Sequence, residues 1–323
     1  MHLSGNLSTL CFYHWVFVSY LALFHLPLHY ALSFNFTSFT NESRLELNGT
    51  ASILNGVLSL TSDPNISSSA GRAVYFEDIQ LFDPSTGKFT DFTTHFSFKI
   101  STVTQPGQDG LAFFLAPKGS LLPVGAQGGC LGLFSRCHDF TVPRKDDQLV
   151  AVEFDTFKND WDAIDGEHVG ININSIRSVQ SKDSGRSLKN ASRVDASIRY
   201  NSKANELSVS WTFPDDPFVG GNTSLSHSIN LTAVLPEWVS IGFSAGSAYF
   251  FETHEILSWE FVTSTESSPD SFSVGLIIAC VIGGLISACG VVSVSVFAWR
   301  KRTRGKGKRG TVENSESMEN GTG

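Results

Sequence analysis

The sequence predicts an all-β sandwich domain followed by one transmembrane helix. Over residues 33–262, short apolar runs alternate with clusters of Gly, Pro, Asn and Asp, which is typical of sandwiches and barrels. The same region keeps no sustained apolar period of about 3.6 residues, so we expect little helix there. A later run, residues 274–299, contains no Asp, Glu, Lys or Arg and is long enough to cross a lipid bilayer.

Residues 1–31 contain the apolar run CFYHWVFVSYLALFHLPLHYA, and polar sequence follows it directly. This pattern is typical of a secretory signal peptide, although an uncleaved membrane anchor has the same composition. A secreted domain can carry N-glycans on Asn-x-Ser/Thr sequons, so we expect glycosylation between the two apolar runs. The acceptor residues are Asn35, Asn41, Asn48, Asn65, Asn190, Asn222 and Asn230.

The clearest β-hairpin lies in ASIRYNSKANELSVSWTF, residues 196–213. Apolar and polar residues alternate on both sides of the polar turn SKANE, as expected for two strands with one buried face. The chain contains 26 Phe residues, which suit an apolar core between two stacked sheets. Further expected strands are short apolar runs at residues 94–100, 110–117, 148–157, 168–175, 236–245 and 254–261.

Two cysteines lie between the apolar runs, Cys130 and Cys137. In an oxidising compartment this pair can form a disulfide, and two unlinked thiols are the alternative. A domain of this length buries enough apolar surface to fold on its core alone, so a disulfide here is an addition and not a requirement.

Residues 263–273 have the composition of a flexible linker. After the apolar run 274–299, the tail 300–323 starts with the basic sequence RKRTRGKGKR, which favours a cytoplasmic position. The expected location is therefore the plasma membrane, as a single-pass type I protein with residues 32–262 outside the cell. The tail is far too short to contain a kinase domain.

The segment VAVEFDTFKNDWD, residues 150–162, combines apolar sequence with many oxygen donors. Side chains alternate along a strand, so Glu153 and Asp155 lie on the same face, where two carboxylates repel each other near a core. A bound cation relieves this repulsion. Asn159 and Asp162 add oxygen donors from the following loop, and His168 adds an imidazole. This donor set predicts a hard cation and a transition ion.

Acidic residues of this kind also suit a solvated loop or an enzyme active site. A solvated acidic loop fits Asp160, Asp165 and Glu167 better than it fits the alternating pair. A retaining glycoside hydrolase needs two carboxyl groups about 5–5.5 Å apart. The neighbouring metal donors make Glu153 and Asp155 ligands instead, and that strand offers no second glutamate to act as acid/base.

Four blocks in order carry a resemblance to a known family. VAVEFDTFKNDWD with the later HVGININS resembles the metal-binding segment of legume-type (L-type) lectins, and DGLAFFLAP, GGCLGLF and PEWVSIGFSA with HEILSWEF match three further blocks of that family. The resemblance covers about residues 33 to 262. It implies a jelly-roll sandwich of two large antiparallel sheets that binds carbohydrate with Ca²⁺ and Mn²⁺.

The resemblance also implies a set of metal ligands. Mn²⁺ or a similar transition ion would take Glu153, Asp155, Asp162 and His168. Ca²⁺ would take Asp155, the backbone carbonyl of Phe157, Asn159 and Asp162. Asp165 is the fallback for Asp162, because the spacing between this Asp and the His varies in the family and Ala163 replaces the usual Pro.

The implied sugar site uses few groups. Asp109 would accept hydrogen bonds from two sugar hydroxyls, the backbone of Gly129 would donate one, and the amide of Asn159 would donate another. Phe157 would pack against the apolar face of the sugar ring. Buried polar groups that are costly to leave unpaired give such a site its specificity.

Two further features follow from the resemblance. The peptide bond between Gln108 and Asp109 is expected to be cis. The loop GSAYFFET has the length found in mannose/glucose-binding members, with the backbone of Tyr249 and Phe250 facing the sugar.

The predicted function is that of a membrane-anchored lectin, similar in architecture to plant L-type lectin receptor-like kinases without their kinase domain. The expected partners are a glycan or glycoprotein, the membrane, a partner kinase for signalling and a second copy in a homodimer; nucleic acid is not among them. Small residues at four-residue spacing in the span allow close helix approach, and such residues are also common in spans that do not associate. The open alternative is the same fold acting as a receptor for a peptide, a nucleotide or an apolar molecule.

Overall fold

The computed structural model describes residues 31–40, 44–61, 68–135, 137, 148–189, 191–215, 223–265 and 293–302. The chain divides into two compact units, of which residues 30–266 form one. The other contributes a short described helix at residues 293–302. Within the described ranges, no helix combines the length and apolar character that a membrane crossing needs. The predicted signal peptide and most of the predicted linker, membrane span and tail lie outside the described residues.

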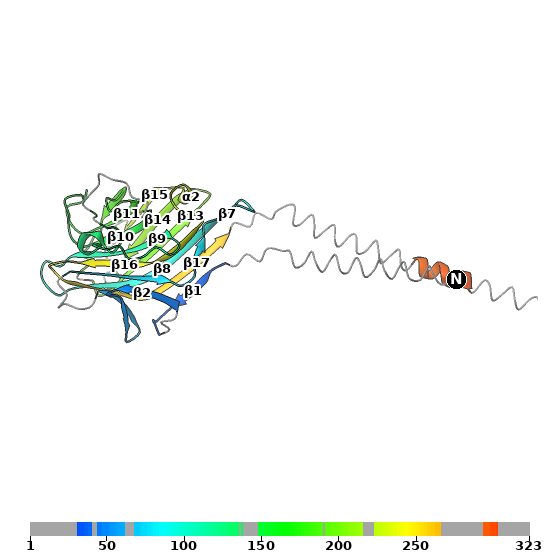
Figure 1. The fold of residues 1–323 in the computed structure, drawn as a ribbon, viewed down its shortest axis with the longest axis horizontal. Helices are drawn as coiled ribbons and strands as arrows, with labels where there is room; N and C mark the ends of the chain where they lie inside the picture. The colour runs from blue at the N-terminus through cyan, green and yellow to red at the C-terminus, as the bar shows by residue number, and fades with distance from the viewer. Residues whose placement is uncertain are drawn as a thin grey trace, which may run out of the picture. The chain divides into compact units, whose positions relative to one another are not determined.

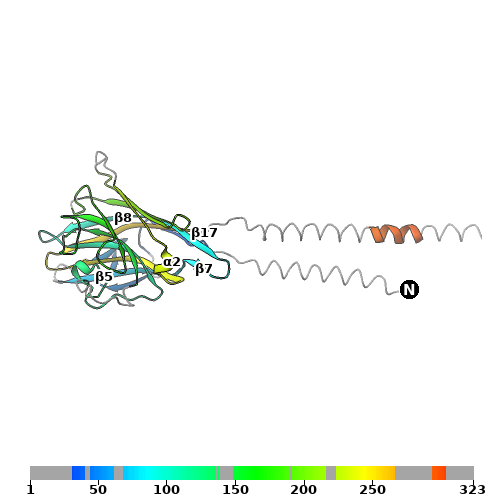
Figure 2. The same cartoon turned by 90° about the horizontal axis from the view of Figure 1, so that it is seen from above.

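The larger sheet has nine strands, and all its pairings are antiparallel. Its strands run in the order β15 (Ser224–Ser228), β14 (Glu206–Thr212), β13 (Val194–Asn201), β8 (Lys88–Thr102), β17 (Glu252–Thr265), β4 (Val57–Thr61) and β3 (Ser52–Leu54), with β1 (Ser33–Phe36) paired to β17 and β7 (Phe82–Asp83) to β8. The long strands β8 and β17 run beside each other through its centre (Figure 2).

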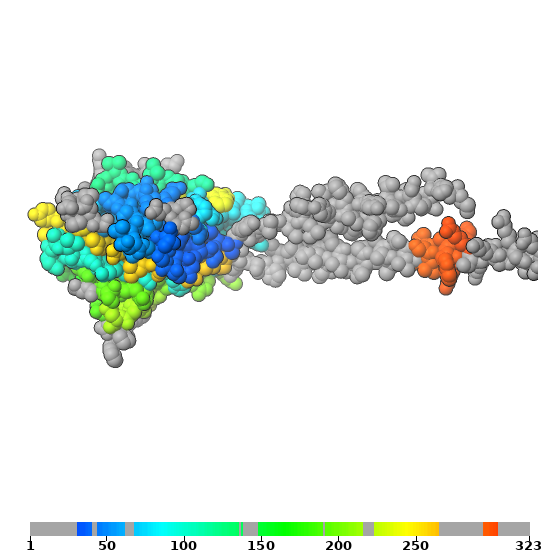
Figure 3. Space-filling model, turned by 90° about the horizontal axis from the view of Figure 1, so that it is seen from below, coloured from blue at the N-terminus to red at the C-terminus, as the bar shows by residue number. Residues whose placement is uncertain are grey.

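The smaller sheet has eight strands, also antiparallel throughout. Its order is β12 (Gln180–Asp183), β11 (His168–Ile173), β10 (Val150–Asp155), β9 (Asp109–Pro117), β16 (Trp238–Ser247), β5 (Ser69–Tyr75) and β2 (Leu45–Gly49), with β6 (Ile79–Gln80) paired to β16. Figure 1 shows the two layers, and Figure 3 shows the face to which the blue N-terminal strands contribute.

The all-β sandwich predicted from the sequence is confirmed. Each strand expected from an apolar run is present, and within the described domain the helices are α2 (Leu231–Val234) and the 3₁₀ turn η2 (Gly128–Cys130). Strand β17 continues to Thr265, three residues beyond residue 262, after which the predicted linker begins. Its last four residues, 262–265, pair with Thr90 to Thr93 on β8. Three of the four are β-branched, which suits an extended strand.

The main core fills the space between the sheets. Phe96 and Phe98 on β8 meet Phe154 on β10 and Phe243 on β16, with ring centroids 4.8 Å apart for Phe96–Phe243 and for Phe98–Phe154. Edge-on and tilted contacts of this kind are favourable beyond the buried area. The expectation of a Phe-rich core between two sheets is confirmed.

A second apolar cluster lies on the outer face of the smaller sheet. On β9, Phe113 points into the main core while Phe114 belongs to the outer cluster. The outer cluster also contains Leu131, Leu133 and the disulfide between Cys130 and Cys137, whose Cα atoms are 5.2 Å apart. Because both faces of the strand are covered, its sequence is apolar throughout and does not alternate. The segment that contains Cys130, Leu131, Leu133 and Cys137 covers this outer face and brings η2 to the start of β9.

The glycosylation acceptors are only partly described. Asn35 and Asn230 are exposed and Asn48 is half-buried, while Asn41, Asn65, Asn190 and Asn222 lie outside the described residues. Asn230 caps α2 by accepting a hydrogen bond from the backbone N–H of Thr232. Glycosylation at these sequons remains a prediction.

Candidate functional site

The acidic cluster forms where β10 pairs with β11. In this register Asp155 lies opposite His168 and Glu153 lies opposite Gly170. Glu153, Asp155 and His168 are each at most 2% exposed. One ligand atom each from Asp155, Asp162 and His168 lies within 4.8 Å of the others, and Nε2 of His168 lies 3.5 Å from Oε1 of Glu153. The structure therefore brings the four predicted transition-metal ligands together.

Local hydrogen bonds orient the ligands. Asp155 accepts from the backbone N–H of Phe157 at 2.8 Å, and Asp162 accepts from that of Asn159 at 2.6 Å. Nδ1 of His168 lies 3.0 Å from the carbonyl of Gly166. A proton on Nδ1 makes this a hydrogen bond and leaves Nε2 free to bind a metal.

Space for the Glu153 carboxylate depends on a glycine. A Cβ on Gly170 would collide with Oε1 of Glu153 and with the hydroxyl of Ser178. Ser178 donates a hydrogen bond to Glu153, and the sequence did not single it out because it follows β11 in an ordinary Ser-rich loop. A residue with a side chain at position 170 would push the carboxylate out of the cluster.

The electrostatics of this cluster favour a cation. Burial raises the pKa of Asp155 well above its usual value, and the charges of Glu153 and Asp162 raise it further. Burial likewise raises the pKa of Asp162 to about 6. Burial lowers the pKa of His168, but the hydrogen bond and charge of Glu153 outweigh it and the net pKa is raised. Clustered buried carboxylates that resist ionisation fit a site in which a metal supplies the missing positive charge.

The flanking acidic residues behave differently from one another. Asp165 is 92% exposed at its side chain and pairs with Lys158 at 3.0 Å, so the geometry favours Asp162 as the ligand. Asp160 is exposed as expected. Glu167 is not a solvated acid. It accepts hydrogen bonds from the backbone N–H of Leu188 at 2.5 Å and from the hydroxyl of Ser187 at 2.9 Å. The sequence could not show this because the partner lies 21 positions later.

The predicted sugar-binding groups converge beside the acidic cluster. Oδ2 of Asp109 and Oδ1 of Asn159 are buried and have no hydrogen-bond partner in the part of the chain that the structure describes. A Cβ on Gly129 would lie 2.7 Å from Oδ1 of Asn159, and one on Gly128 would lie 3.4 Å from Oδ2 of Asp109. Two glycines thus keep side chains away from two buried acceptors, which are costly to leave unpaired.

Asp109 lies at the start of β9 and is 1% exposed. Its peptide bond with Gln108 is cis, as the resemblance implied, and the bond between Gln105 and Pro106 is cis as well. Burial raises the pKa of Asp109 to about 7, and the charges of Glu252 and Asp162 add to the shift. A ligand that donates hydrogen bonds to this carboxylate would favour its charged form.

The loop before β17 contacts the segment that leads to Asp109. Tyr249 is 81% exposed at the rim. The backbone N–H of Phe250 donates to Oε1 of Gln108 at 3.2 Å, and its carbonyl accepts from the N–H of Gln108 at 2.8 Å. Phe250 therefore supports the segment that carries Asp109, and a sugar contact at Tyr249 or Phe250 stays a prediction.

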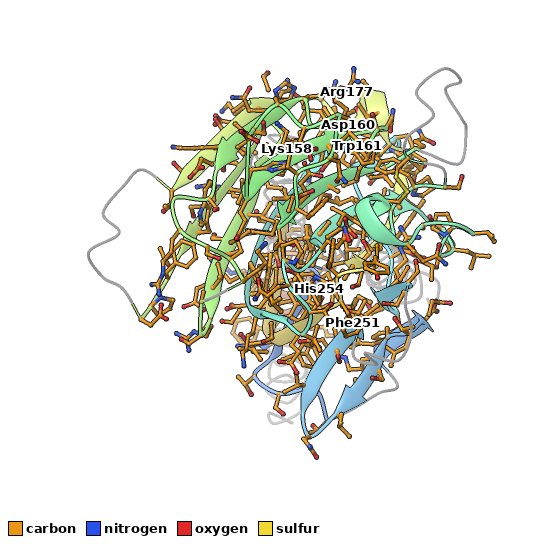
Figure 4. All side chains as sticks on the ribbon, turned by 90° about the vertical axis from the view of Figure 1, so that its left-hand side faces the viewer. Lys158, Asp160, Trp161, Arg177, Phe251 and His254 are labelled. Carbon is orange, nitrogen blue, oxygen red and sulfur yellow. A yellow bond between two sulfur atoms is a disulfide. The ribbon has the colours of Figure 1, made fainter. Side chains whose placement is uncertain are left out.

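Aromatic residues border the site on the loop after β10. Phe157 is half-buried. The predictions overlooked Trp161, which packs against the outer apolar cluster with its Cζ2 atom 3.0 Å from where a Cβ on Gly129 would lie. Figure 4 labels Lys158, Asp160 and Trp161 on this loop. The WD pair inside the metal-binding motif was the signal that could have identified Trp161.

A second polar cluster was not anticipated from the sequence. Glu252 and His254 on β17 are both 0% exposed, with Oε2 and Nε2 3.3 Å apart. The hydroxyl of Thr156 donates to Oε2 of Glu252 at 2.7 Å, and the hydroxyl of Thr61 lies 2.7 Å from Nδ1 of His254. The Glu252 carboxylate also packs against Gly107, which precedes Gln108. This network joins the back of the Asp109 segment to the end of β10.

Comparison with known proteins gives a consistent result. The sequence matches the family described as Legume lectin domain over residues 31–274. It is 40% identical over 251 residues to anti-H(O) lectin 2 of Ulex europaeus, covering 73% of this chain and 96% of that protein. It is 37% identical to the mannose-specific lectin CML-2 of Centrolobium microchaete over 245 residues, covering 73% and 95%.

Solved structures agree with the sequence match. A lectin from Bauhinia forficata in complex with GalNAc superposes with a TM-score of 0.64 at 35% identity, covering 73% of this chain and 99% of that one. The seed lectin of Lotus tetragonolobus superposes with a TM-score of 0.65 at 36% identity, covering 73% and 100%. The shared region contains both sheets and the acidic cluster between β10 and β11.

Proposed function

The chain belongs to the legume lectin domain family, and from this membership we propose that its outer domain binds carbohydrate in a metal-dependent manner. The relatives that establish the family are carbohydrate-binding proteins and not enzymes, so no residue is assigned a catalytic role. Legume lectins generally bind Ca²⁺ and Mn²⁺, and the buried cluster of Asp155, Asp162 and His168 fits such ions.

One observation supports the proposal most strongly. The buried oxygens of Asp109 and Asn159 have no hydrogen-bond partner in the described residues, and each lies close to one of the two glycines that precede Cys130. Hydroxyl groups of a sugar would pair with Asp109, and a calcium ion would pair with the carbonyl oxygen of Asn159. A folded domain that buries two such acceptors together is suited to a hydroxylated ligand.

Each site residue has a defined part in the proposed binding. The Asp109 carboxylate accepts from two neighbouring hydroxyls, while the backbone N–H of Gly129 and the amide of Asn159 donate to the sugar. The ring of Phe157 packs against the apolar C–H face. When bound, the ions neutralise the buried carboxylates and fix the loop that carries Asn159. Phe157 and Asn159 complete the calcium ligands with Asp155 and Asp162.

We propose mannose or glucose as the sugar, because the loop from Gly246 to Thr253 has the length found in members that bind these sugars. The mannose-specific relative from Centrolobium microchaete is consistent with this choice. The relative solved with GalNAc shows that the family accommodates other sugars. Binding confined to galactose-type or fucose-type glycans would disprove the sugar identity and leave the carbohydrate-binding function intact.

A glycan array tests the function. The full-length chain in detergent should bind with added Ca²⁺ and Mn²⁺ and lose binding in EDTA. Asp109→Asn should reduce binding by at least about 100-fold, since it removes a charged acceptor of two hydrogen bonds. Asp160→Asn, an exposed acid near the site, is the matched control and should bind normally. A folded, metal-loaded chain that binds no glycan would instead support a peptide, a nucleotide or an apolar ligand.

We further propose that the protein is anchored in the plasma membrane by residues 274–299 and acts as a receptor-like protein through a partner kinase. The uncharged apolar composition of that segment and the basic run after it support the anchor. Protease added to intact cells should digest the lectin domain and spare a tag on residue 323. A protein recovered entirely in the medium would contradict the anchor.

A further inference from the structure

Three separate segments meet at Thr156, directly after the metal-binding strand β10. Thr156 is 2% exposed. Its N–H donates to the carbonyl of Asp109 at 2.9 Å, its hydroxyl donates to Glu252 at 2.7 Å, and its carbonyl accepts from Nζ of Lys189 at 2.9 Å. The position of the proposed metal loop relative to Asp109 therefore depends on every polar group of Thr156.

Lys189 extends this connection to two further segments. Its Nζ donates to the carbonyl of Pro106 at 3.1 Å, in the loop that leads to β9, as well as to that of Thr156. Nζ also lies 3.6 Å from Oε1 of Glu167, the residue directly before β11. Two N–H donors of the ammonium group therefore have carbonyl acceptors, and the Glu167 carboxylate lies at ion-pair distance. One side chain thus joins the segments before β9, after β10 and before β11.

Lys189 and its ion-pair partner Glu167 are both partly buried, and Glu167 is held by further hydrogen bonds. The Lys189 side chain is 15% exposed, and that of Glu167 is 18% exposed. Glu167 also accepts from the hydroxyl of Ser187 at 2.9 Å and from the N–H of Leu188 at 2.5 Å, both in the residues that lead to Lys189. A mobile surface ion pair contributes little, whereas a partly buried ammonium with two carbonyl partners holds its neighbours in place.

The charge of Lys189 is unfavourable for the proposed function by itself. A positive group near a cation site repels the ion, so by Coulomb interaction alone its removal would strengthen metal binding. Its contacts with two backbone carbonyls provide a reason for a lysine at this position despite the repulsion.

We propose that Lys189 is a positioning residue that holds the Asp109 segment, the loop after β10 and the start of β11 in the arrangement needed for metal and sugar binding. This proposal rests on the function proposed above. It predicts that losing Lys189 weakens cation binding, which is opposite in sign to the effect of charge alone.

The test compares two lysines of the full-length chain. Lys189→Met removes the ammonium group and keeps most of the apolar side chain. Lys158→Met removes an equal charge from the metal loop, where Lys158 is 45% exposed and bonds only Asp165 among the described contacts. Calcium titration should show affinity reduced about tenfold for Lys189→Met, as for other residues that orient metal ligands. Lys158→Met should bind calcium as tightly as the unchanged protein or more tightly.

Amide hydrogen exchange gives a second measurement without metal. In chelator, the N–H of Thr156 should exchange faster in Lys189→Met than in Lys158→Met, because its partner Asp109 is no longer held in place. An unchanged chain that binds no calcium would disprove the proposed function, while this exchange difference still tests Lys189. Calcium affinity of Lys189→Met equal to or above that of the Lys158→Met control, or equal exchange rates, would overturn the proposal.

If Lys189→Met does not fold, Glu167→Gln replaces it. In this variant the amide oxygen can still accept from the N–H of Leu188, the new NH2 group can donate to the hydroxyl of Ser187, and the negative partner of the ammonium group is removed. Thr156 exchange should rise and calcium affinity should fall about threefold, a smaller effect because the two carbonyl contacts of Lys189 remain. No change in either quantity would contradict the role of Lys189.

Discussion

Glu153 and His168 form one buried carboxylate–imidazole pair in this domain, and Glu252 and His254 form another. The closest N–O distances are 3.5 Å and 3.3 Å, and all four residues are at most 1% exposed. The two pairs differ in their surroundings. Two more carboxylates, Asp155 and Asp162, accompany the first pair, whereas hydroxyl groups accompany the second.

This difference separates a binding site from a structural network. Asp155 and Asp162 bring negative charge that the single His168 cannot balance, so binding of a cation is favourable. Asp162 is half-buried, so a cation can reach the cluster from solvent. Around Glu252, the hydroxyls of Thr61 and Thr156 contact the pair at hydrogen-bond distance without adding charge. The Thr61–His254–Glu252 order resembles a nucleophilic triad, but its complete burial excludes a substrate.

The largest expected effect concerns the second pair. Glu252→Ala leaves His254 and the hydroxyl of Thr156 buried without their partner, so the free energy of unfolding should fall by about 3–5 kcal/mol. Chemical denaturation should show this loss already in chelator, because the pair itself binds no ion. A loss seen only in calcium would mean that the network belongs to the metal site. Glu255→Ala, on the same strand and half-buried, serves as the control.

In the cluster around the first pair, the loss of a carboxylate should weaken metal binding without lowering the stability of the metal-free chain. Asp155→Asn removes a ligand shared by both proposed ions, so calcium affinity should fall by at least about 100-fold, roughly 2.7 kcal/mol. In chelator the same variant should unfold at an equal or higher temperature than the unchanged protein, because it removes repulsion among buried carboxylates. Titration calorimetry and thermal unfolding measure the two effects. A variant less stable in chelator would contradict the charge argument.

The same contrast explains what the sequence could predict. Glu153, Asp155, Asn159 and Asp162 lie within one strand and its following loop, so alternation and spacing were enough to group them. Glu252 and Thr156 are 96 positions apart, and Lys189 meets Pro106 across 83 positions. Such contacts depend on how the sheets stack, which a local pattern does not contain.

The fold shows the same limit. Strands with a run of Val, Ile and Phe, such as β10, were predicted, but β5 was not. Its sequence SAGRAVY contains a glycine and an arginine, although every residue in it is buried. The close approach of β4 selects Gly71, because a Cβ there would collide with the backbone of Leu60. Tertiary packing thus overrides the weak strand preference of this segment.

The pH dependence of stability should reverse with metal. In chelator, Asp109 and Asp162 have pKa values of about 7 and about 6, above the usual 3.8. Between about pH 4 and 7 the folded chain therefore holds protons that the unfolded chain releases, so stability falls as pH rises. We expect a loss of about 2 kcal/mol from pH 5 to pH 7.5, after allowing for solvent screening at Asp162. With excess calcium, stability should rise over the same range, because ions bind deprotonated ligands. Thermal unfolding at both pH values measures this, and a common trend with and without calcium would contradict it.

The smallest expected effect distinguishes the two aspartates that could serve as the loop ligand. Asp165 is almost fully exposed and pairs with Lys158, so Asp165→Asn should change calcium affinity by less than about twofold. Asp162→Asn removes a half-buried carboxylate grouped with Asp155 and His168, and should reduce affinity by about as much as Asp155→Asn. Because both changes are isosteric and remove one charge from the same loop, the difference between them isolates direct ligation from general electrostatics. Equal, small losses in both variants would mean that the loop attracts the ion only by its charge, and the contrast between the two Glu–His pairs would then rest on the strand residues alone.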